Sequence, residues 1–184
     1  DNAQGAAAIA EKWVEAMDYE GKYAELLGLE SDTNCWVRSE NYHAVISQYE
    51  GLEMVAQQSA GWSQTEGYAK TEAILQAHPE ITGIICGNDT MACGAAQACI
   101  DAGRTDIKII GLDGSDDAAA YIKSGNLVGT ALQQIAAITE LAVEEAVNYI
   151  ENGVKPEQEK QLVPCVAITI ENVEFLSAFV YTGE

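Results

Sequence analysis

Residues 82–103 read TGIICGNDTMACGAAQACIDAG, in which an apolar strand signal, a polar turn and a helical stretch follow one another directly. Residues 82–86 are the strand signal, residues 87–90 the turn and residues 91–102 the helical pattern. A short apolar strand that runs through a polar turn into a helix is typical of a parallel sheet whose two faces are covered by helices.

The same unit repeats outward from this stretch in both directions. Apolar strand signals lie at residues 23–29, 53–58, 107–112, 128–132 and 162–170. Helical periodicity marks residues 4–17, 35–49, 64–77, 116–124 and 135–152, and four helices are followed by a glycine, at Gly51, Gly103, Gly125 and Gly153. We therefore predict an α/β fold in which one all-parallel, Rossmann-like sheet is sandwiched between helices. Right-handed crossovers then place the carboxyl ends of all strands on one edge.

The composition limits the classes of function. The 184 residues carry 29 acidic and 9 basic side chains, which gives a formal net charge of −20. This charge argues against a nucleic-acid partner, because Lys and Arg are needed to bind phosphates. No apolar run approaches the ~20 residues that span a bilayer. The chain begins at Asp1 without Met, so we expect a preceding segment to have been removed, and the lack of a leader says nothing of export.

Five cysteines occur without a CxxC pair, at Cys35, Cys86, Cys93, Cys99 and Cys165. An odd number in a chain of this length argues against a disulfide framework or a zinc site. Because Cys86, Cys93 and Cys99 have apolar neighbours, we predict that they are buried and act as small apolar residues. The sequence gives no reason to expect a metal or a cofactor.

Polar and aromatic side chains collect in the turns that follow the predicted strands. Arg38 lies in the first turn of the helix after the first strand, and Trp62, Asn88, Asp113 and Gln133 follow the next four strands in order. Ligands of open α/β sheets bind outside the carboxyl ends of the strands. We therefore predict a binding site made of these five residues.

The chemistry of this set suits a neutral polyol. A carboxylate at Asp113 accepts hydroxyl hydrogens, and the Arg38 guanidinium donates to hydroxyl oxygens in a fixed fork. The amides of Asn88 and Gln133 both donate and accept, and Trp62 offers a flat apolar face to the C–H side of a sugar ring. A cleft with an apolar wall and a few placed polar groups is the usual form of a small-molecule site.

Each polar turn also has a structural interpretation. Asn88 and Asp89 are typical caps of the helix that follows them. Asp113 and Gly114 form a typical turn pair. In these interpretations the residues stabilise the chain locally and need no ligand.

Trp62 and Arg38 have structural interpretations as well. Trp62 can pack on its own loop, and Arg38 can pair on the surface with Asp32 or Glu40. The shared placement of all five residues on one sheet edge carries the prediction of a site, more than any single residue does.

Three motifs resemble those of the type I periplasmic sugar-binding proteins. Residues 85–96, ICGNDTMACGAA, with Ala102-Gly103 after them, resemble the NDxMAxGA…AG signature. Residues 109–114, IIGLDG, match the VxGxDG strand and turn, and residues 124–133, SGNLVGTALQ, resemble the GxLxATxxQ hinge strand. Further likenesses lie at Asp1-Asn2, Gly5 and residues 167–173. The resemblance covers nearly the whole chain and is closest to the ribose-binding branch.

The resemblance implies a function and a site. Proteins of this family are solute-binding components of ABC sugar importers, which hold a monosaccharide or polyol between two lobes without changing it, so no enzyme is expected. It implies ligand contacts at Arg38, Trp62, Asn88, Asp113 and Gln133, with Trp62 in the place of a stacking aromatic. It also implies a membrane permease as partner and a periplasmic or extracellular location, with room for a lipoprotein anchor ahead of Asp1.

The resemblance also divides the chain. Residues 1–134 correspond to the C-terminal ligand-binding lobe, and residues 135–184 to a helix and a strand that return to an N-terminal lobe absent from this chain. The apolar residues of the predicted helix at 135–152 spread over about half of its circumference, wider than a one-sided stripe. We therefore expect this helix to find a substitute surface or to pair with a second copy.

Two other functions fit parts of the sequence. The effector-binding domain of a lactose-repressor-type transcriptional regulator shares the fold and the Asn-Asp turn. Such proteins tend to carry PxLTTV where residues 125–130 read GNLVGT here, and the acidic charge favours transport. An enzyme is disfavoured because no GxSxG, HExxH, P-loop or GxGxxG motif occurs, and His43 and His78 are interpreted as surface or capping residues.

Overall fold

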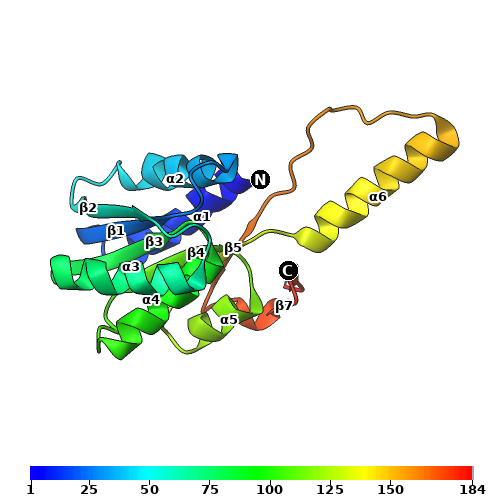
Figure 1. Ribbon diagram of the computed structural model, residues 1–184. Helices are drawn as coiled ribbons and strands as arrows, with labels where there is room; N and C mark the ends of the chain where they lie inside the picture. The colour runs from blue at the N-terminus through cyan, green and yellow to red at the C-terminus, as the bar shows by residue number, and fades with distance from the viewer. Residues whose placement is uncertain (184) are drawn as a thin grey trace.

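The computed structural model describes residues 1–183. Six strands form one sheet in the spatial order β2 (Leu52–Ser59), β1 (Gly21–Leu27), β3 (Ile81–Cys86), β4 (Lys108–Asp113), β5 (Gly129–Leu132) and β6 (Val166–Thr169). The first five strands run parallel to one another (Figure 1). A hairpin of β7 (Leu176–Ser177) and β8 (Val180–Tyr181) follows a 3-10 turn at Val173–Phe175. The predicted α/β fold with a mainly parallel sheet is confirmed.

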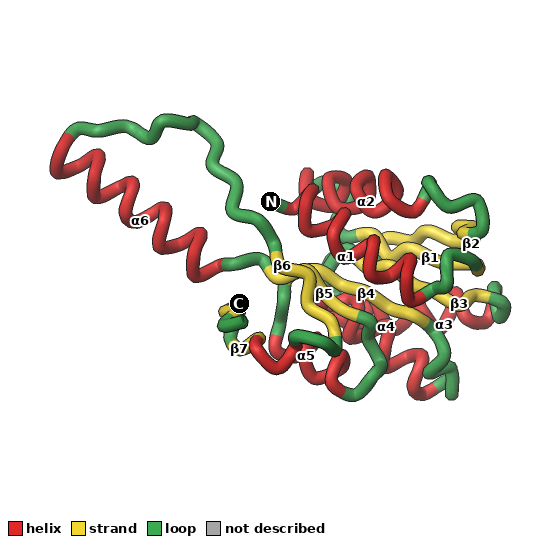
Figure 2. The backbone as a smooth tube through the Cα atoms, turned by 180° about the vertical axis from the view of Figure 1, so that it is seen from behind, coloured by secondary structure: helices red, strands yellow, loops and turns green. Residues whose placement is uncertain are grey.

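Helices cover both faces of the sheet, as Figures 1 and 2 show from opposite sides. One face carries α1 (Asn2–Ala16) and α2 (Thr33–Ile46), and the other carries α3 (Gln64–Ala77), α4 (Asp89–Asp101) and α5 (Asp116–Lys123). These helices and the first five strands begin and end within three residues of the predicted bounds. Gly103, Gly125 and Gly153 have the left-handed conformation predicted for helix ends, whereas Gly51 does not, because α2 already ends at Ile46.

Alternate residues of the central strands supply two apolar cores, one on each face. Ile84 and Ile109 pack with the α3, α4 and α5 side, whereas Ile85 and Ile110 pack with the α1 and α2 side. Strands that are covered on both faces are apolar on both faces, which explains their continuous apolar runs. Cys86, Cys93 and Cys99 lie in the first of these cores, as predicted, and all five cysteines are buried.

Strand β6 corrects the prediction of an all-parallel sheet. Residues 162–170 were expected to form a strand that returns to an absent lobe, but only Val166–Thr169 is a strand, and it pairs antiparallel with β5. The reason lies in the route of the chain. After β5 the chain leaves the carboxyl edge of the sheet, runs through residues 134–165 and returns to the same edge, so β6 enters the sheet in the opposite direction (Figure 2).

Helix α6 (Ile135–Asn152) projects away from the sheet, and residues 153–165 return beside it (Figure 1). None of its residues is buried, and the exposed fraction reaches 57% at Val143 and 80% at Ile150. Within residues 1–183 most apolar side chains of this helix therefore lack a covering surface. None of the helices in this part of the chain is both long and apolar enough to cross a bilayer.

The packing of α3 on α4 yields a first prediction. A Cβ at Gly94 of α4 would overlap the carbonyl oxygen of Gln64 and lie 2.9 Å from the amide nitrogen of Tyr68. We expect Gly94→Ala to lower the free energy of unfolding by about 1–3 kcal/mol, because this overpacking outweighs the higher helix propensity of alanine. Urea unfolding measures the change. The exposed Thr90→Ala on the same helix is the control and should stay within about 0.5 kcal/mol of the parent; a stable Gly94→Ala would contradict the close approach.

A candidate ligand-binding site at the carboxyl edge of the sheet

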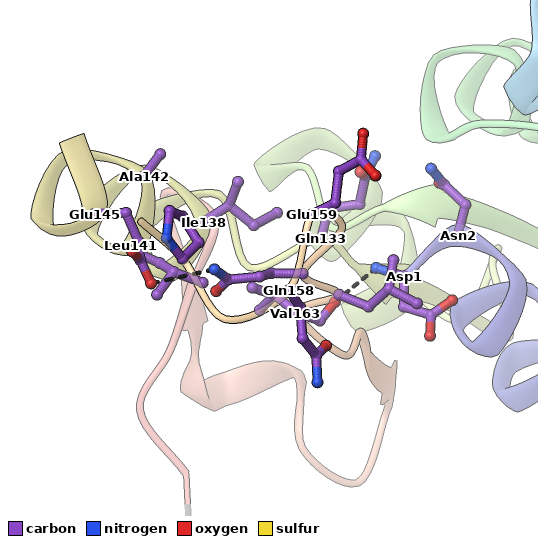
Figure 3. Close-up of a pocket in the computed structure, with 13 residues that line it drawn as sticks. Asp1, Asn2, Gln133, Ile138, Leu141, Ala142, Glu145, Gln158, Glu159 and Val163 are labelled. Carbon is purple, nitrogen blue, oxygen red and sulfur yellow. Dashed lines mark hydrogen bonds between the residues drawn. The ribbon is translucent and has the colours of Figure 1, made fainter. Parts of the chain in front are cut away.

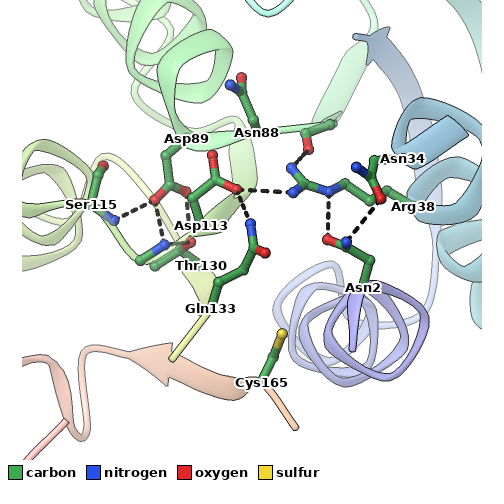
Figure 4. Close-up of polar contacts among 12 residues, drawn as sticks. Asn2, Asn34, Arg38, Asn88, Asp89, Asp113, Ser115, Thr130, Gln133 and Cys165 are labelled. Carbon is green, nitrogen blue, oxygen red and sulfur yellow. Dashed lines mark hydrogen bonds and ion pairs between the residues drawn. The ribbon is translucent and has the colours of Figure 1, made fainter. Parts of the chain in front are cut away.

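The strand order has a topological switch point between β1 and β3. The chain moves outward from β1 to β2 and then crosses back to β3, so neighbouring connections diverge at this point. Open α/β sheets bind ligands at such a switch point. The turns after β1, β2, β3, β4 and β5 all end at this edge, and they carry the predicted site residues (Figure 4).

Arg38 is the most highly connected side chain of the site. It is 6% exposed, and its Nε donates to Asn2 Oδ1 over 2.9 Å while its NH1 donates to the carbonyl oxygen of Gly87 over 2.8 Å. Its NH2 lies 3.1 Å from Asp113 Oδ1. The expected alternative, a surface pair with Asp32 or Glu40, is therefore wrong. A guanidinium carries five N–H groups, so two of them remain for a ligand.

Trp62 forms the apolar wall beside Arg38. The Arg38 Cζ atom lies 5.4 Å from the centre of the indole ring, within the range of a cation–π contact. The ring packs over Gly28 and Gly87, where a Cβ at either position would press into it. Trp62 has a φ of 65°, a left-handed conformation that is strained for a bulky residue. Strain of this kind concentrates at ligand sites, where surrounding structure holds it in place.

Asp113 completes the polar core of the site. Its Oδ1 accepts a hydrogen bond from Gln133 Nε2 over 2.7 Å and faces Arg38 NH2. Burial raises the pKa of Asp113, while the Arg38 charge and the Gln133 amide act in the opposite direction. Both contacts end on Oδ1, so Oδ2 is left to accept from a ligand. Asp113 is also strained, with a φ of 139°.

Asn88 lies at the same edge and has the structural role that the sequence offered as an alternative. Its Oδ1 accepts from the backbone N–H of Met91 over 2.9 Å, so Asn88 is the N-cap of α4. Its side-chain nitrogen remains a possible donor to a ligand. Figure 4 shows Arg38, Asp113 and Gln133 in one connected cluster with Asn88 beside it. Trp62 joins this cluster through its contact with Arg38. No group of three or more metal-binding side chains occurs within residues 1–183.

Asp89 has a different role from the one predicted. Asp89 is not the cap of α4. Its side chain is buried, 1% exposed, and it anchors the turn after β4. Its Oδ2 accepts from the backbone N–H groups of Gly114 and Ser115 over 2.8 and 2.7 Å, and its Oδ1 accepts from the Thr130 hydroxyl over 2.6 Å. This carboxylate therefore fixes the turn that presents Asp113.

Two amides, Asn2 and Asn34, support the site without having been predicted from the sequence. Asn2 accepts from Arg38 and donates through Nδ2 to Asn34 Oδ1 over 3.0 Å. Asn2 was noted only as part of a motif at the start of the chain. No local pattern indicates that α1 brings Asn2 to the guanidinium of Arg38 or that Asn34 of α2 accepts from Asn2.

Most of the chain matches a known protein family. The sequence pattern of the family described as periplasmic binding protein domain matches residues 1–154. The chain belongs to this family. The predicted resemblance is therefore confirmed, and with it the assignment to the fold of one lobe of such a protein.

Individual family members support the assignment. A D-apiose import binding protein of Actinobacillus succinogenes is 49% identical over 180 residues, which are 97% of this chain and 58% of that protein. A D-apiose import binding protein of Paraburkholderia graminis is 44% identical over 179 residues, 97% of this chain and 57% of that protein. Both are named as binding proteins and not as enzymes. This chain thus spans less than two thirds of the length of these periplasmic binding proteins.

Solved structures give the same result. A solute binding protein of Actinobacillus succinogenes with bound D-allose superimposes with a TM-score of 0.90 at 30% identity, over 95% of this chain and 60% of that one. One of Bacillus halodurans with bound myo-inositol gives 0.87 at 27% identity, also over 95% and 60%. This periplasmic binding protein domain therefore has the fold of slightly more than half of each structure.

Asp89 yields a prediction for the dependence of stability on pH. Burial raises the pKa of Asp89 from 3.8 to about 6, and the Asp113 charge adds to this, while hydrogen bonds from Thr130 and Ser115 oppose it. Because the folded pKa is above the unfolded value, the folded protein binds more protons between these two pH values. Stability contributed by this group is therefore present at the acidic end and is lost as the pH rises through the window. We expect a loss of up to about 3 kcal/mol between pH 4 and pH 7.

The measurement compares unfolding free energies of the parent and Asp89→Asn across this pH range. The amide does not titrate, so the stability of the parent relative to Asp89→Asn should fall as the pH rises. The exposed Asp117→Asn in the first turn of α5 is the control and should retain the pH dependence of the parent. Parallel curves for the parent and Asp89→Asn would contradict the titration of Asp89 in this range.

Proposed function

We propose that this edge of the sheet binds a neutral monosaccharide or polyol, in the role of the solute-binding component of an ABC sugar importer. The observation that carries the proposal is the paired Arg38 and Asp113, which face each other at 3.1 Å beside the indole of Trp62. The two formal charges balance within the site. A ligand with its own charge would leave one charge uncompensated in a partly buried place, which costs free energy.

The groups left unpaired match the surface of a sugar. Arg38 retains two N–H donors, Asp113 retains Oδ2 as an acceptor, and Asn88 retains its amide N–H groups. Hydroxyl groups both donate and accept, so a polyol satisfies donors and acceptors at once. The face of Trp62 covers the apolar C–H side of the same ring. Because several contacts already hold Arg38, little ordering remains to be done on binding.

We propose D-apiose as the first ligand to test. Two proteins that are 49% and 44% identical to this chain are named D-apiose import binding proteins. A ribose import binding protein of Bacillus subtilis is 36% identical over 146 residues, so D-ribose is the second candidate. D-Allose and myo-inositol, bound in two similar structures, complete the panel.

We further propose that the site is one half of a cleft and that a second lobe closes over it. In this proposal residues 1–134 form the ligand-binding lobe, and α6 with the segment after it contacts the second lobe. Closure of two lobes on a ligand is a hinge motion, and the closed form would dock on a membrane permease. The location would be outside the cytoplasmic membrane, where a lipoprotein anchor ahead of Asp1 would keep the protein near the permease.

A transcriptional regulator remains the alternative role for the same fold. The relatives named above are import proteins, and the net charge of −20 opposes binding to nucleic acid. Both observations support transport over regulation.

Replacement of Asp113 tests the proposed ligand site. In a protein that carries both lobes, we expect Asp113→Ala to raise the dissociation constant for D-apiose at least about 100-fold. It removes charge-assisted hydrogen bonds worth about 1.5–3 kcal/mol each and leaves the Arg38 charge unpaired. Isothermal titration calorimetry measures the change. The exposed Glu30→Gln in the loop after β1 is the control and should leave the constant unchanged.

Two results would contradict the proposal at different levels. An unchanged dissociation constant in Asp113→Ala would remove Asp113 from the site. Failure of the parent protein to bind any of the four panel ligands would reject sugar binding itself. The 184-residue chain supplies only one side of the cleft, so it should bind D-apiose weakly or not at all, and submicromolar affinity would argue against a second lobe.

Helix α6 supports the proposal of a second lobe and gives another test. A hollow of about 390 Å³ lies between α6 and the returning segment, lined by Ile138, Leu141 and Ala142 on one side and by Gln158 and Val163 on the other. Figure 3 shows these side chains. Of the five predicted site residues only Gln133 lines this hollow, so the hollow adjoins the ligand site and does not coincide with it. The outward apolar residues of α6, Val143, Val147 and Ile150, stay uncovered.

We expect the 184-residue chain to self-associate through these outward residues. Sedimentation velocity should show dimers or larger species, and the double change Val147→Glu with Ile150→Glu should shift them to monomer, because charges disfavour an apolar contact. Leu29→Glu is the control, since Leu29 is also exposed, at 51%, but lies in the loop after β1. A parent chain that sediments only as a monomer would contradict the prediction.

A further inference from the structure

A buried carboxylate lies beneath helix α2, outside the ligand site. Glu25 of β1 is 1% exposed, although Tyr23, two residues earlier on the same side of the strand, packs in the apolar core. A buried charge is unfavourable unless it is paired and hydrogen-bonded. Glu25 Oε2 is paired in this way, since it lies 2.8 Å from His43 Nε2 and accepts from Gln57 Nε2 over 2.6 Å.

His43 is the partner that connects this carboxylate to the helix. Its side chain is 30% exposed, and its Nδ1 lies 3.3 Å from the Tyr23 hydroxyl. His43 is therefore half-buried, and the interpretation as a surface or capping residue missed its contacts with β1. Burial raises the pKa of Glu25, but hydrogen bonds from His43, Gln57 and Ser39 outweigh it and lower the pKa overall. The hydrogen bond with Glu25 raises the pKa of His43. The contact therefore favours the charged form of both groups and ties α2 to β1.

Apart from the contacts of His43 and Ser39 with β1, the polar contacts of α2 with the sheet lie at its carboxyl edge, at the ends of β3 and β4. The Tyr42 hydroxyl donates to the carbonyl oxygen of Cys86 over 3.1 Å, and Arg38 NH1 donates to the carbonyl oxygen of Gly87. Both hydrogen bonds end at consecutive residues, so they hold α2 at one place on the sheet. The contact of His43 with Glu25 reaches β1, the neighbouring strand, and holds α2 at a second place. The buried apolar side chains Tyr42, Val45 and Ile46 set which face of α2 meets the sheet. The hydrogen-bonded contact with Glu25 is directional and restrains the rotation further.

We propose that the Glu25–His43 pair is a positioning device for Arg38. By fixing the rotation of α2 about its axis, the pair holds the guanidinium of Arg38 against Asp113 and Trp62. Arg38 precedes His43 by little more than one turn of the same helix, so a roll of α2 moves its guanidinium away from the site. The effect on sugar affinity rests on the proposed function; the effect on Arg38 itself does not.

The experiment follows the Arg38 Nε–H group, which donates to Asn2, in the 184-residue chain. Its exchange with solvent is measured by NMR in the parent, His43→Ala and His43→Gln. We expect His43→Ala to speed this exchange about tenfold, as loss of one hydrogen bond to a charged group implies. His43→Gln keeps a side-chain N–H at a similar position and should stay within about twofold of the parent. The backbone amide of Ile84, in the central strand β3, reports global opening and should not change.

Tyr121→Phe is the matched control on the opposite face of the sheet. It removes one hydrogen bond, from Tyr121 to Gln97 Oε1, and should leave the exchange of Arg38 unaltered. Unchanged Arg38 exchange in His43→Ala would overturn the proposal. So would equal acceleration at Arg38 and Ile84, because the pair would then contribute only to overall stability.

The second readout is the affinity for D-apiose in a protein that carries both lobes. His43→Ala should raise the dissociation constant about three- to tenfold, and His43→Gln should restore it to within about twofold of the parent. If affinity is unchanged in His43→Ala while Arg38 exchange is faster, the positioning role in ligand binding is rejected. If the parent binds no sugar, the proposed function fails, and the exchange of Arg38 still decides whether the pair positions that residue.

Discussion

The carboxylate of Asp89 is the interaction on which the candidate site depends. It lies at the first residue of α4 and binds two backbone N–H groups of the turn after β4 and a hydroxyl on β5. It therefore joins the ends of three neighbouring strands in the interior of the protein. Asp113 in that turn has a φ of 139°, a conformation that costs free energy for a residue with a Cβ. The hydrogen bonds to Gly114 and Ser115 offset this cost and keep the Asp113 carboxylate directed at Arg38.

The side chains of the candidate site hold one another in place. Arg38 is held by Asn2, Gly87 and Asp113, and Asp113 in turn is held by Gln133. Such a network makes a buried ion pair tolerable, because each remaining polar atom has a partner or faces the open edge. The indole of Trp62 packs over Gly28 and Gly87. Because the carbonyl oxygen of Gly87 also accepts from Arg38, the same turn holds both the indole and the guanidinium. If the proposed site binds a ligand, a charge-balanced cluster of this kind would discriminate by hydroxyl geometry more than by charge.

The sequence predicted the residues that face the open edge of the candidate site better than the residues that hold them in place. Arg38, Trp62, Asp113 and Gln133 were expected to lie together because parallel strands end on one side of the sheet, and the structure places them in contact. Sequence patterns assigned Asp89 the wrong role and did not indicate the roles of Glu25 and Asn2. The partners of these residues lie far along the chain, and capping or strand patterns do not predict such contacts. The apolar run at residues 162–170 indicated a strand but not its direction. That direction depends on the route of residues 134–165, which no local pattern describes.

The apolar face of helix α6 and the open side of the candidate site both need a covering surface. An isolated helix of this length is marginal in water and gains stability mainly from the packing of its apolar face. In residues 1–183 most of that face has no cover, and the helix begins two residues after Gln133, which contacts Asp113. A body that packs on α6 would therefore lie next to the open side of the candidate site. In the proposed two-lobe arrangement, covering the helix and closing the cleft would be two consequences of one contact, so the free energy of covering α6 would help to hold the second lobe over the site.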